Sequence, residues 1–122
     1  MIGYVTLGTN DIDRAAKFYD ALLGDLGAKR AMVTDRFIAW ASGAGQPMIM
    51  AMKPFDGKAA TVGNGVMVAL AVDSKAKVDA IYKKAMELGA KDEGPAGPRG
   101  DGFYAGYFRD PDGNKLNVFF MG

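Results

Sequence analysis

The chain has 122 residues, of which 49% are hydrophobic, a formal net charge of +1, and neither histidine nor cysteine. Its length allows one domain with a substantial core, and its balanced charge provides no basic face of the kind that nucleic acid requires. Without cysteine there is no disulfide, thiolate nucleophile or sulfur-ligated zinc. Without histidine there is no serine–histidine or cysteine–histidine nucleophile system and no imidazole metal ligand.

The first half of the chain has the pattern of a strand, a helix and three short strands. Alternating apolar and small or polar residues predict a strand at residues 2–9. Asn10 or Asp11 is placed to cap a helix with an apolar stripe at helical spacing, and Gly24 and Gly27 end it. Further strands are expected at residues 29–33, 36–41 and 48–52.

After a polar, glycine-bearing connection at residues 53–65, the same plan starts again. A strand is expected at residues 66–72, and Asp73 or Ser74 is placed to cap a second helix that Gly89 ends. The remaining pattern predicts strands at residues 91–93, 103–109 and 115–121, with a loop rich in glycine and proline at residues 94–102.

The two halves resemble each other in sequence as well as in plan. Leu26-Gly27-Ala28-Lys29 recurs as Leu88-Gly89-Ala90-Lys91 after the second helix. A half-length repeat of this kind indicates a duplicated module, and one module cannot bury both faces of its sheet, so the two copies should pair. We therefore predict an α+β fold of two paired βαβββ modules, at about residues 1–57 and 64–122, in a single domain.

The closing stretch, residues 106–121, is expected to form a strand, a tight turn and a strand. Asp110-Pro111-Asp112-Gly113 supplies the turn, because proline presets φ and glycine accepts a positive φ without steric conflict. Leu116, Val118 and Phe120 then alternate with Lys115, Asn117 and Phe119, as in a strand with two distinct faces. On this basis Asn117 should point into whatever the sheet encloses.

An aromatic strand, the sequence Asp-Pro-Asp-Gly-Asn, and a strand with a polar residue resemble the closing signature of the glyoxalase/bleomycin-resistance/dioxygenase family. This family is also called the vicinal oxygen chelate (VOC) superfamily. Its fold is the same duplicated βαβββ module, so the resemblance covers essentially the whole chain. The resemblance implies two modules that curl around a cavity, and many relatives form dimers.

In the family's metalloenzymes, each module gives one metal ligand from its first strand and another from its last. Carried over to this chain, the resemblance places the first-strand positions at Tyr4 and Met67, and the last-strand positions at Met50 and Asn117. The position of Asn117 is usually a glutamate in those enzymes. Thioether and amide groups are poor ligands for hard or borderline divalent ions, so we expect neither a metal nor another cofactor here.

These four side chains predict a soft, mostly apolar cavity floor where a phenol and an amide orient a small organic molecule. An alternative is that Met50 and Met67 fill the sheet interior as core, and that a core hydrogen bond satisfies Asn117. Tyr4 is either a ligand-orienting group or a core residue whose hydroxyl reaches solvent. The sequence does not separate these alternatives.

Three more residues complete the set of candidate ligand-binding positions. Trp40 is by default a core or dimer-contact residue, and an aromatic wall of the cavity is the alternative. Arg99 and Tyr104 lie on a segment that could cover the mouth of a cleft, whereas a solvated pair of Arg99 with Asp101 is the simpler interpretation. No catalytic residue is identified.

Two functions stay open. The first is a binding module, a metal-free glyoxalase-like protein that holds a small organic molecule in the cavity between its two modules. The second is an enzyme, a glyoxalase I-type lyase or isomerase or a thiol-transfer catalyst, although no residue pair offers a convincing general base. We expect a cytoplasmic protein that does not bind a membrane, because no signal peptide or membrane-spanning apolar run is apparent. The balanced charge predicts no binding to nucleic acid. The dimers formed by many relatives imply a homodimer.

Overall fold

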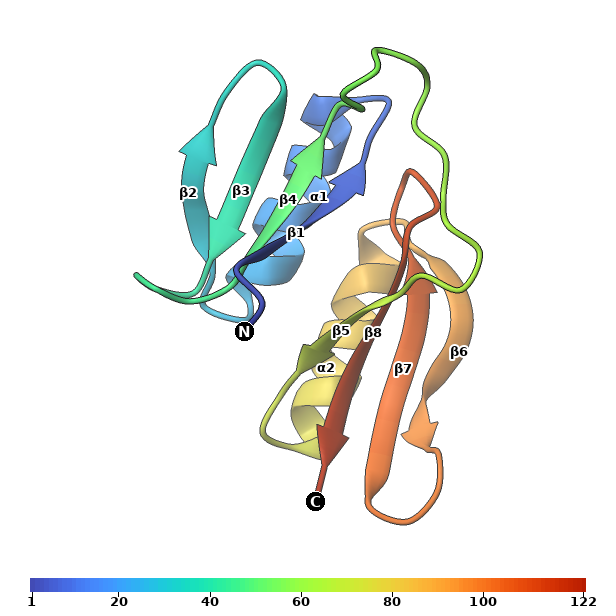
Figure 1. The fold of residues 1–122 in the computed structure, drawn as a ribbon. Helices are drawn as coiled ribbons and strands as arrows, with labels where there is room; N and C mark the ends of the chain where they lie inside the picture. The colour runs from blue at the N-terminus through green and yellow to red at the C-terminus, as the bar shows by residue number, and fades with distance from the viewer. The chain divides into compact units, whose positions relative to one another are not determined.

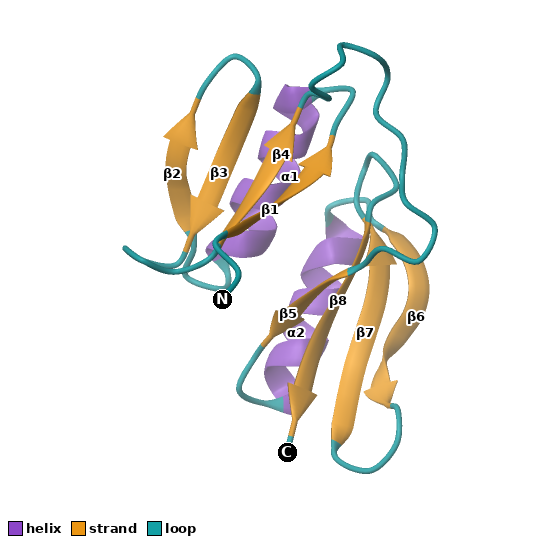
Figure 2. Ribbon diagram, in the orientation of Figure 1, coloured by secondary structure: helices purple, strands orange, loops and turns teal.

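The computed structural model describes all residues 1–122 and divides the chain into two compact units, Met1–Val62 and Gly63–Gly122. Each unit contains a four-stranded sheet with one helix packed on one face (Figures 1 and 2). The predicted α+β fold of two βαβββ modules is confirmed.

The two units have the same order of elements. The first unit comprises β1 (Tyr4–Gly8), α1 (Ile12–Gly24), β2 (Lys29–Val33), β3 (Phe37–Ala41) and β4 (Met48–Met52). The second unit comprises β5 (Val68–Ala71), α2 (Lys75–Glu87), β6 (Lys91–Pro98), β7 (Phe103–Arg109) and β8 (Lys115–Met121). The sheet orders are β1-β4-β3-β2 and β5-β8-β7-β6, and in each sheet only the first pair of strands is parallel. This common topology is the structural form of the sequence repeat.

Both helices have 13 residues and begin at a side-chain cap. The carboxylate of Asp11 and the hydroxyl of Ser74 each accept a hydrogen bond, at 3.1 Å, from the backbone N–H three residues further on. These bonds satisfy donors that have no partner within the first helical turn. After each helix the chain turns at a glycine with positive φ, 80° at Gly27 and 89° at Gly89, where a side chain would be strained.

The core of the first unit lies between α1 and its sheet. Trp40 is 1% exposed, and its ring centroid lies 5.5 Å from that of Tyr19 on the helix. The indole Nε1 of Trp40 donates to Oδ1 of Asp20 at 2.8 Å, and Asp20 also accepts two hydrogen bonds from Arg30. The hydrogen bond from Arg30 is the main cause that lowers the pKa of Asp20. One carboxylate therefore ties α1 to both β2 and β3.

Strand β6 is longer than the sequence predicts. The predicted strand stops at residue 93, where a glycine- and proline-rich loop is expected, whereas the observed strand continues to Pro98. Its register with β7 shifts at two places, on either side of Gly94. Such bulges leave residues out of the ladder, and β6 lies at the sheet edge, where proline is tolerated because its missing N–H is not needed.

Strand β7 approaches α2 closely at a residue without a side chain. A Cβ added to Gly106 would lie 2.8 Å from Cδ1 of Tyr82 on α2. The hydroxyl of Tyr82 donates to Oδ1 of Asp92 at 2.7 Å, and burial together with this bond raises the pKa of Tyr82 to about 12. Gly106 therefore sets the distance between the helix and the sheet of the second unit.

The replacement Gly106→Ala should lower the free energy of unfolding by about 1–3 kcal/mol, because the ring of Tyr82 has to move to make room for the methyl group. Denaturation by urea measures this change. Gly24→Ala is the matched control, since outside its own helix and chain neighbours no atom lies within 4 Å of the added Cβ, and it should leave stability unchanged or raise it by up to about 1 kcal/mol. Equal effects of the two replacements would contradict the close packing.

Candidate functional site

Each sheet has one face covered by its helix and a second face that no helix of its unit covers, which we call the helix-free face (Figure 2). Successive side chains of a strand point to opposite faces, and directly opposed residues on neighbouring strands share a face. Trp40 faces α1, and the Cβ position of Gly106 faces α2. These two residues fix the direction of the side chains on the regularly paired strands, whereas the register shifts in β2 and β6 interrupt the alternation there.

Tyr4 and Met50 both lie on the helix-free face of the first sheet. Ile49 is opposite Trp40 and shares its helix-facing side, so Met50 points the other way. In the parallel ladder of β1 and β4, Tyr4 is opposite Met48, two residues before Met50. Tyr4 is 58% exposed, whereas Met50 is buried. The phenol of Tyr4 is thus accessible to solvent, as a ligand-orienting role requires.

Asn117 lies on the helix-free face of the second sheet. Its neighbour Val118 is opposite Gly106 and faces α2, so Asn117 and its cross-strand partner Tyr107 face away from the helix. Its partner on the other side is Ala69 of β5. Met67, two residues before Ala69, precedes the strand and is partly exposed.

The ladder registers give Met50 and Asn117 the same place in their respective sheets. Thr6 and Ala69 each lie six residues before the first residue of the following helix. Thr6 is opposite Met50, and Ala69 is opposite Asn117. This correspondence agrees with the last-strand positions that the family resemblance implied for Met50 and Asn117.

The side chains at the four positions that correspond to metal ligands do not fit a divalent ion. They are a phenol, two thioethers and an amide, from Tyr4, Met50, Met67 and Asn117. Calcium and magnesium prefer carboxylates, and zinc prefers imidazole or thiolate. The structure also contains no group of three or more histidine, cysteine, aspartate or glutamate side chains that could hold a metal ion.

Asn117 is the most unusual polar residue of the structure. It is 1% exposed, and its Oδ1 atom is buried without a hydrogen-bond partner. An unsatisfied buried acceptor costs about 1–3 kcal/mol, and most buried side-chain polar atoms have a partner. The core hydrogen bond considered from sequence is therefore absent at this oxygen, which a ligand donor would reach only after the side chains that cover it move.

Two of the predicted ligand-binding residues lie on the helix-facing side. Trp40 is enclosed in the core of the first unit, so the structure favours its core interpretation over the cavity wall. The hydroxyl of Tyr104 donates to Oδ1 of Asp79 on α2 at 2.7 Å. Neither side chain lies on the helix-free face.

Arg99 lies on the helix-free side of the second sheet. Its Cζ atom is 5.5 Å from the ring centroid of Tyr107. Its guanidinium donates to the carbonyl oxygens of Pro95, at 2.5 Å, and Pro98, at 3.3 Å, rather than to the carboxylate of Asp101. The arginine therefore stacks near an aromatic ring, and the solvated pair with Asp101 that the sequence allowed is not formed.

Sequence reasoning missed two residues beside Asn117. Tyr107 is its direct partner on β7, and Lys115 lies two residues before it on β8, on the same face. The Nζ atom of Lys115 is 5.6 Å from the ring centroid of Tyr107. The sequence did contain a signal for both residues. The turn at residues 110–113 pairs the two strands, and period-two alternation places Lys115 on the same face as Asn117.

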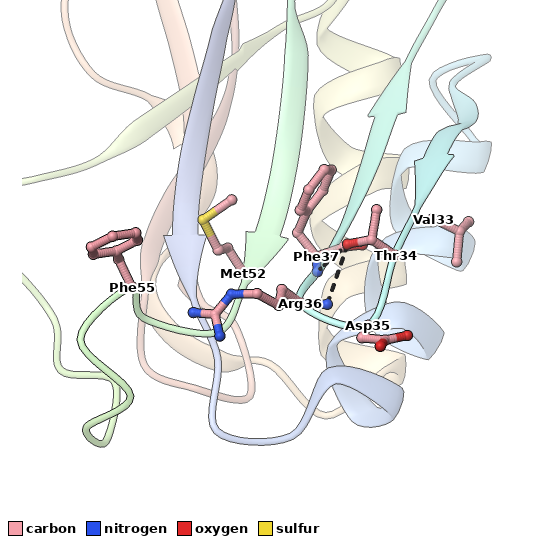
Figure 3. Close-up of a pocket in the computed structure, with 7 residues that line it drawn as sticks. All are labelled: Val33, Thr34, Asp35, Arg36, Phe37, Met52 and Phe55. Carbon is pink, nitrogen blue, oxygen red and sulfur yellow. Dashed lines mark hydrogen bonds between the residues drawn. The ribbon is translucent and has the colours of Figure 1, made fainter.

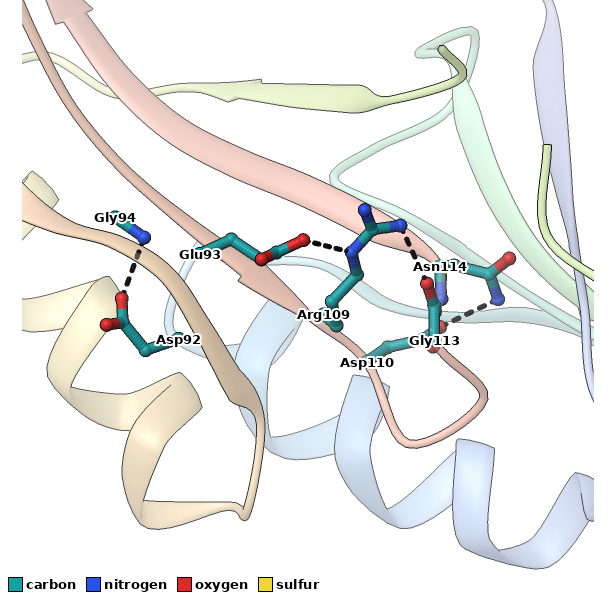
Figure 4. A network of polar contacts seen from close by, with 7 residues as sticks. All are labelled: Asp92, Glu93, Gly94, Arg109, Asp110, Gly113 and Asn114. Carbon is teal, nitrogen blue, oxygen red and sulfur yellow. Dashed lines mark hydrogen bonds and ion pairs between the residues drawn. The ribbon is translucent and has the colours of Figure 1, made fainter. Parts of the chain in front are cut away.

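A row of basic residues crosses the same face beside the β7–β8 turn. Lys91 is opposite Arg109, and Arg109 is opposite Lys115. The Nε atom of Arg109 donates to Oε1 of Glu93 at 2.6 Å, and its Nη1 donates to the carbonyl of Gly113 (Figure 4). The hydrogen bond from Arg109 is the main cause that lowers the pKa of Glu93, with smaller contributions from Lys115 and Lys91. One carboxylate thus partly offsets three cations.

The first unit has a hollow at the β2–β3 turn, with a volume of about 620 Å³ (Figure 3). Its wall includes Phe37 and Met52, which are opposite each other on the helix-free face, and Phe55 from the connection after β4. Arg36 closes part of its rim, where its Nη2 donates to the carbonyl of Pro54 at 2.8 Å. Sequence patterns did not indicate this hollow, because a turn and a connection form it together.

Neither helix has the length and apolar composition that crossing a bilayer requires. The family model of the glyoxalase/bleomycin resistance protein/dioxygenase superfamily matches residues 1–118. The chain therefore belongs to this superfamily, as its closing hairpin and internal repeat indicated.

Solved structures with the same fold cover almost the whole chain. A glyoxalase/bleomycin resistance protein from Albidiferax ferrireducens T118 is 33% identical, with a TM-score of 0.91 over 100% of this chain and 99% of that one. A family enzyme from Burkholderia phytofirmans PsJN is 18% identical, with a TM-score of 0.79 and 98% of each chain covered. A lactoylglutathione lyase from Agrobacterium tumefaciens is 22% identical, with a TM-score of 0.73 over 98% and 92%. No protein of curated function matches the chain.

The replacement Asn117→Leu should raise the free energy of unfolding by about 1–2 kcal/mol without ligand, because it removes an unsatisfied buried acceptor and keeps a similar shape. Thermal or urea unfolding measures this effect.

Asn114→Leu is the matched control for this replacement. The Nδ2 atom of Asn114 donates to Oδ2 of Asp110 at 3.0 Å in the turn (Figure 4), so its loss should destabilise the protein by about 1–3 kcal/mol. If Asn117→Leu destabilises the protein as much as Asn114→Leu, the amide of Asn117 has a structural partner after all.

Proposed function

We propose that this chain is a metal-free, ligand-binding member of its superfamily, with a small organic molecule held against the helix-free face of a sheet. The observation that carries the proposal is the unpaired Oδ1 atom of buried Asn117. Evolved ligand sites combine mostly apolar walls with a few polar groups that orient the ligand. An amide acceptor among alanine and aromatic side chains is such a group.

The helix-free face of the first sheet supplies the second part of the support. Met48, Met50 and Met52 all point to this face, because alternate residues of β4 share a side. Methionine is flexible and polarisable, and it adapts to ligands of irregular shape. The exposed phenol of Tyr4 adds a hydrogen-bonding group to this apolar surface.

A glyoxalase I-type lyase, isomerase or thiol-transfer enzyme is the alternative that the experiment has to separate. The likeness to a lactoylglutathione lyase, at 22% identity, concerns the fold. The donor set of Tyr4, Met50, Met67 and Asn117 does not fit the ion of such an enzyme.

Ligand binding should raise the melting temperature in a library screen of small organic molecules, with equal shifts in EDTA and in added nickel, manganese, zinc or iron. A ligand present at about a hundred times its Kd stabilises the folded state by about 2.7 kcal/mol. Differential scanning fluorimetry on untagged protein measures the shift.

Three results would contradict this function. They are a lower melting temperature after chelation, a stoichiometric metal in the purified protein, and turnover of glutathione with methylglyoxal. An absence of any stabilising ligand would also count against it.

We infer in addition that the protein forms a homodimer. Val33 and Phe55 are both exposed and line the same hollow of the first unit, and contiguous exposed apolar surface marks association sites. Light scattering after size-exclusion chromatography should give twice the chain mass of 12.9 kDa. A monomer mass at micromolar concentration would rule this assembly out.

A further inference from the structure

We propose that the helix-free face of the second sheet recognises a small organic carboxylate that also carries a hydroxyl or amino group. Arg99 and Lys115, whose charged groups lie near the ring of Tyr107, would bind the carboxylate. Asn117 would accept a hydrogen bond from the second group. This inference rests on the proposed binding function and names the chemical class of its ligand.

The arrangement of the basic residues is the first argument. Like charges directly opposite each other in a sheet are destabilising, yet Lys91, Arg109 and Lys115 form one cross-strand row. Glu93 pairs with Arg109 and leaves the two lysines without a comparable close partner. An anionic ligand would relieve this repulsion, so the row favours a negatively charged guest.

The position of Arg99 is the second argument. A Cβ added to Gly94 would lie 3.2 Å from Nη2 of Arg99, and one added to Gly97 would lie 3.4 Å from Nη1. The two glycines of β6 therefore leave the space that the guanidinium occupies. Its hydrogen bonds to Pro95 and Pro98 use two of its five N–H donors. The remaining donors suit a carboxylate, which arginine binds in a planar, bidentate geometry.

The burial of Asn117 is the third and independent argument. Its side chain shares a face with Tyr107 and is directly opposite it in the ladder, so it lies beside the ring that both cations approach. Opposed residues on neighbouring strands have Cβ atoms about 4.5–5.5 Å apart. A ligand carboxylate near Tyr107 would thus place a donor on its adjacent carbon beside Asn117, and the donor would reach the buried Oδ1 once the side chains that cover this oxygen move.

The same face becomes apolar further along the strands. Phe119 is two residues beyond Asn117, and it lies between Ala71 and Ala105 in the ladder. The rings of Phe119 and Phe103 stack with centroids 5.5 Å apart. A molecule with a carboxylate at one end and an aromatic or aliphatic body at the other matches this change from basic to apolar.

The test uses mandelate, which has a carboxylate, an adjacent hydroxyl and a phenyl ring, in NMR titrations of isotope-labelled full-length protein. Phenylacetate lacks the hydroxyl, and mandelamide lacks the charge. Mandelate should shift the side-chain amide signals of Asn117 and bind about tenfold more tightly than either analogue, the ratio expected for loss of one charged or buried hydrogen bond.

Two variants assign these preferences to residues. Lys115→Gln should weaken mandelate binding about tenfold and leave the affinity for mandelamide unchanged, because it removes only the charge. Asn117→Leu should bind mandelate and phenylacetate equally, because it removes the amide that would pair with the hydroxyl. Lys83→Gln on α2 removes the same charge away from this face and should bind all three probes as the unmodified protein does.

The inference is overturned if mandelamide binds as tightly as mandelate, if Lys115→Gln and Lys83→Gln behave alike, or if none of the three probes shifts the signal of Asn117. Binding of neutral molecules in the library screen, together with any of these results, leaves the proposed binding function intact and refutes only the carboxylate preference. If no molecule of the library and none of the probes binds, both proposals fail.

Discussion

One α-helix covers one face of a four-stranded sheet, so about half of the side chains in every strand of this protein lie on a face that their own unit leaves without a helix. Trp40 and the empty Cβ position of Gly106 mark the covered sides, and alternation assigns the rest. The helix-free faces carry Met50 and Asn117, which are equivalent in the two ladders. The functional proposals depend on the chemistry that these faces present.

The elements that alternate most regularly could be predicted from the sequence. The bounds of β8 and the side to which Asn117 points followed from period-two alternation after the turn at residues 110–113. Strand β6 could not be predicted beyond residue 93, because Gly94 and Pro95 weaken the local preference for a strand, and its pairing with β7 determines the structure instead.

The candidate site could be predicted only in part, because strand pairing, and not the local sequence, brings several of its residues together. Asn117 stands out because a polar residue on an enclosed strand face is rare, whereas Lys115 and Tyr107 are ordinary residues until the hairpin register brings them together. Arg99 was singled out for its loop, but its position near Tyr107 depends on the space left by Gly94 and Gly97. Trp40 offered no signal in sequence that separates a core residue from a cavity wall.

The two prolines of β6 have a consequence for association with other chains. An edge strand with free N–H and C=O groups can pair with a strand of another molecule and start aggregation. At this edge Pro95 and Pro98 have no N–H to offer, and their carbonyl oxygens already accept hydrogen bonds from Arg99. The two prolines therefore hinder strand addition at the outer edge of the second sheet, which makes this glycine-rich strand a poorer template for fibrils.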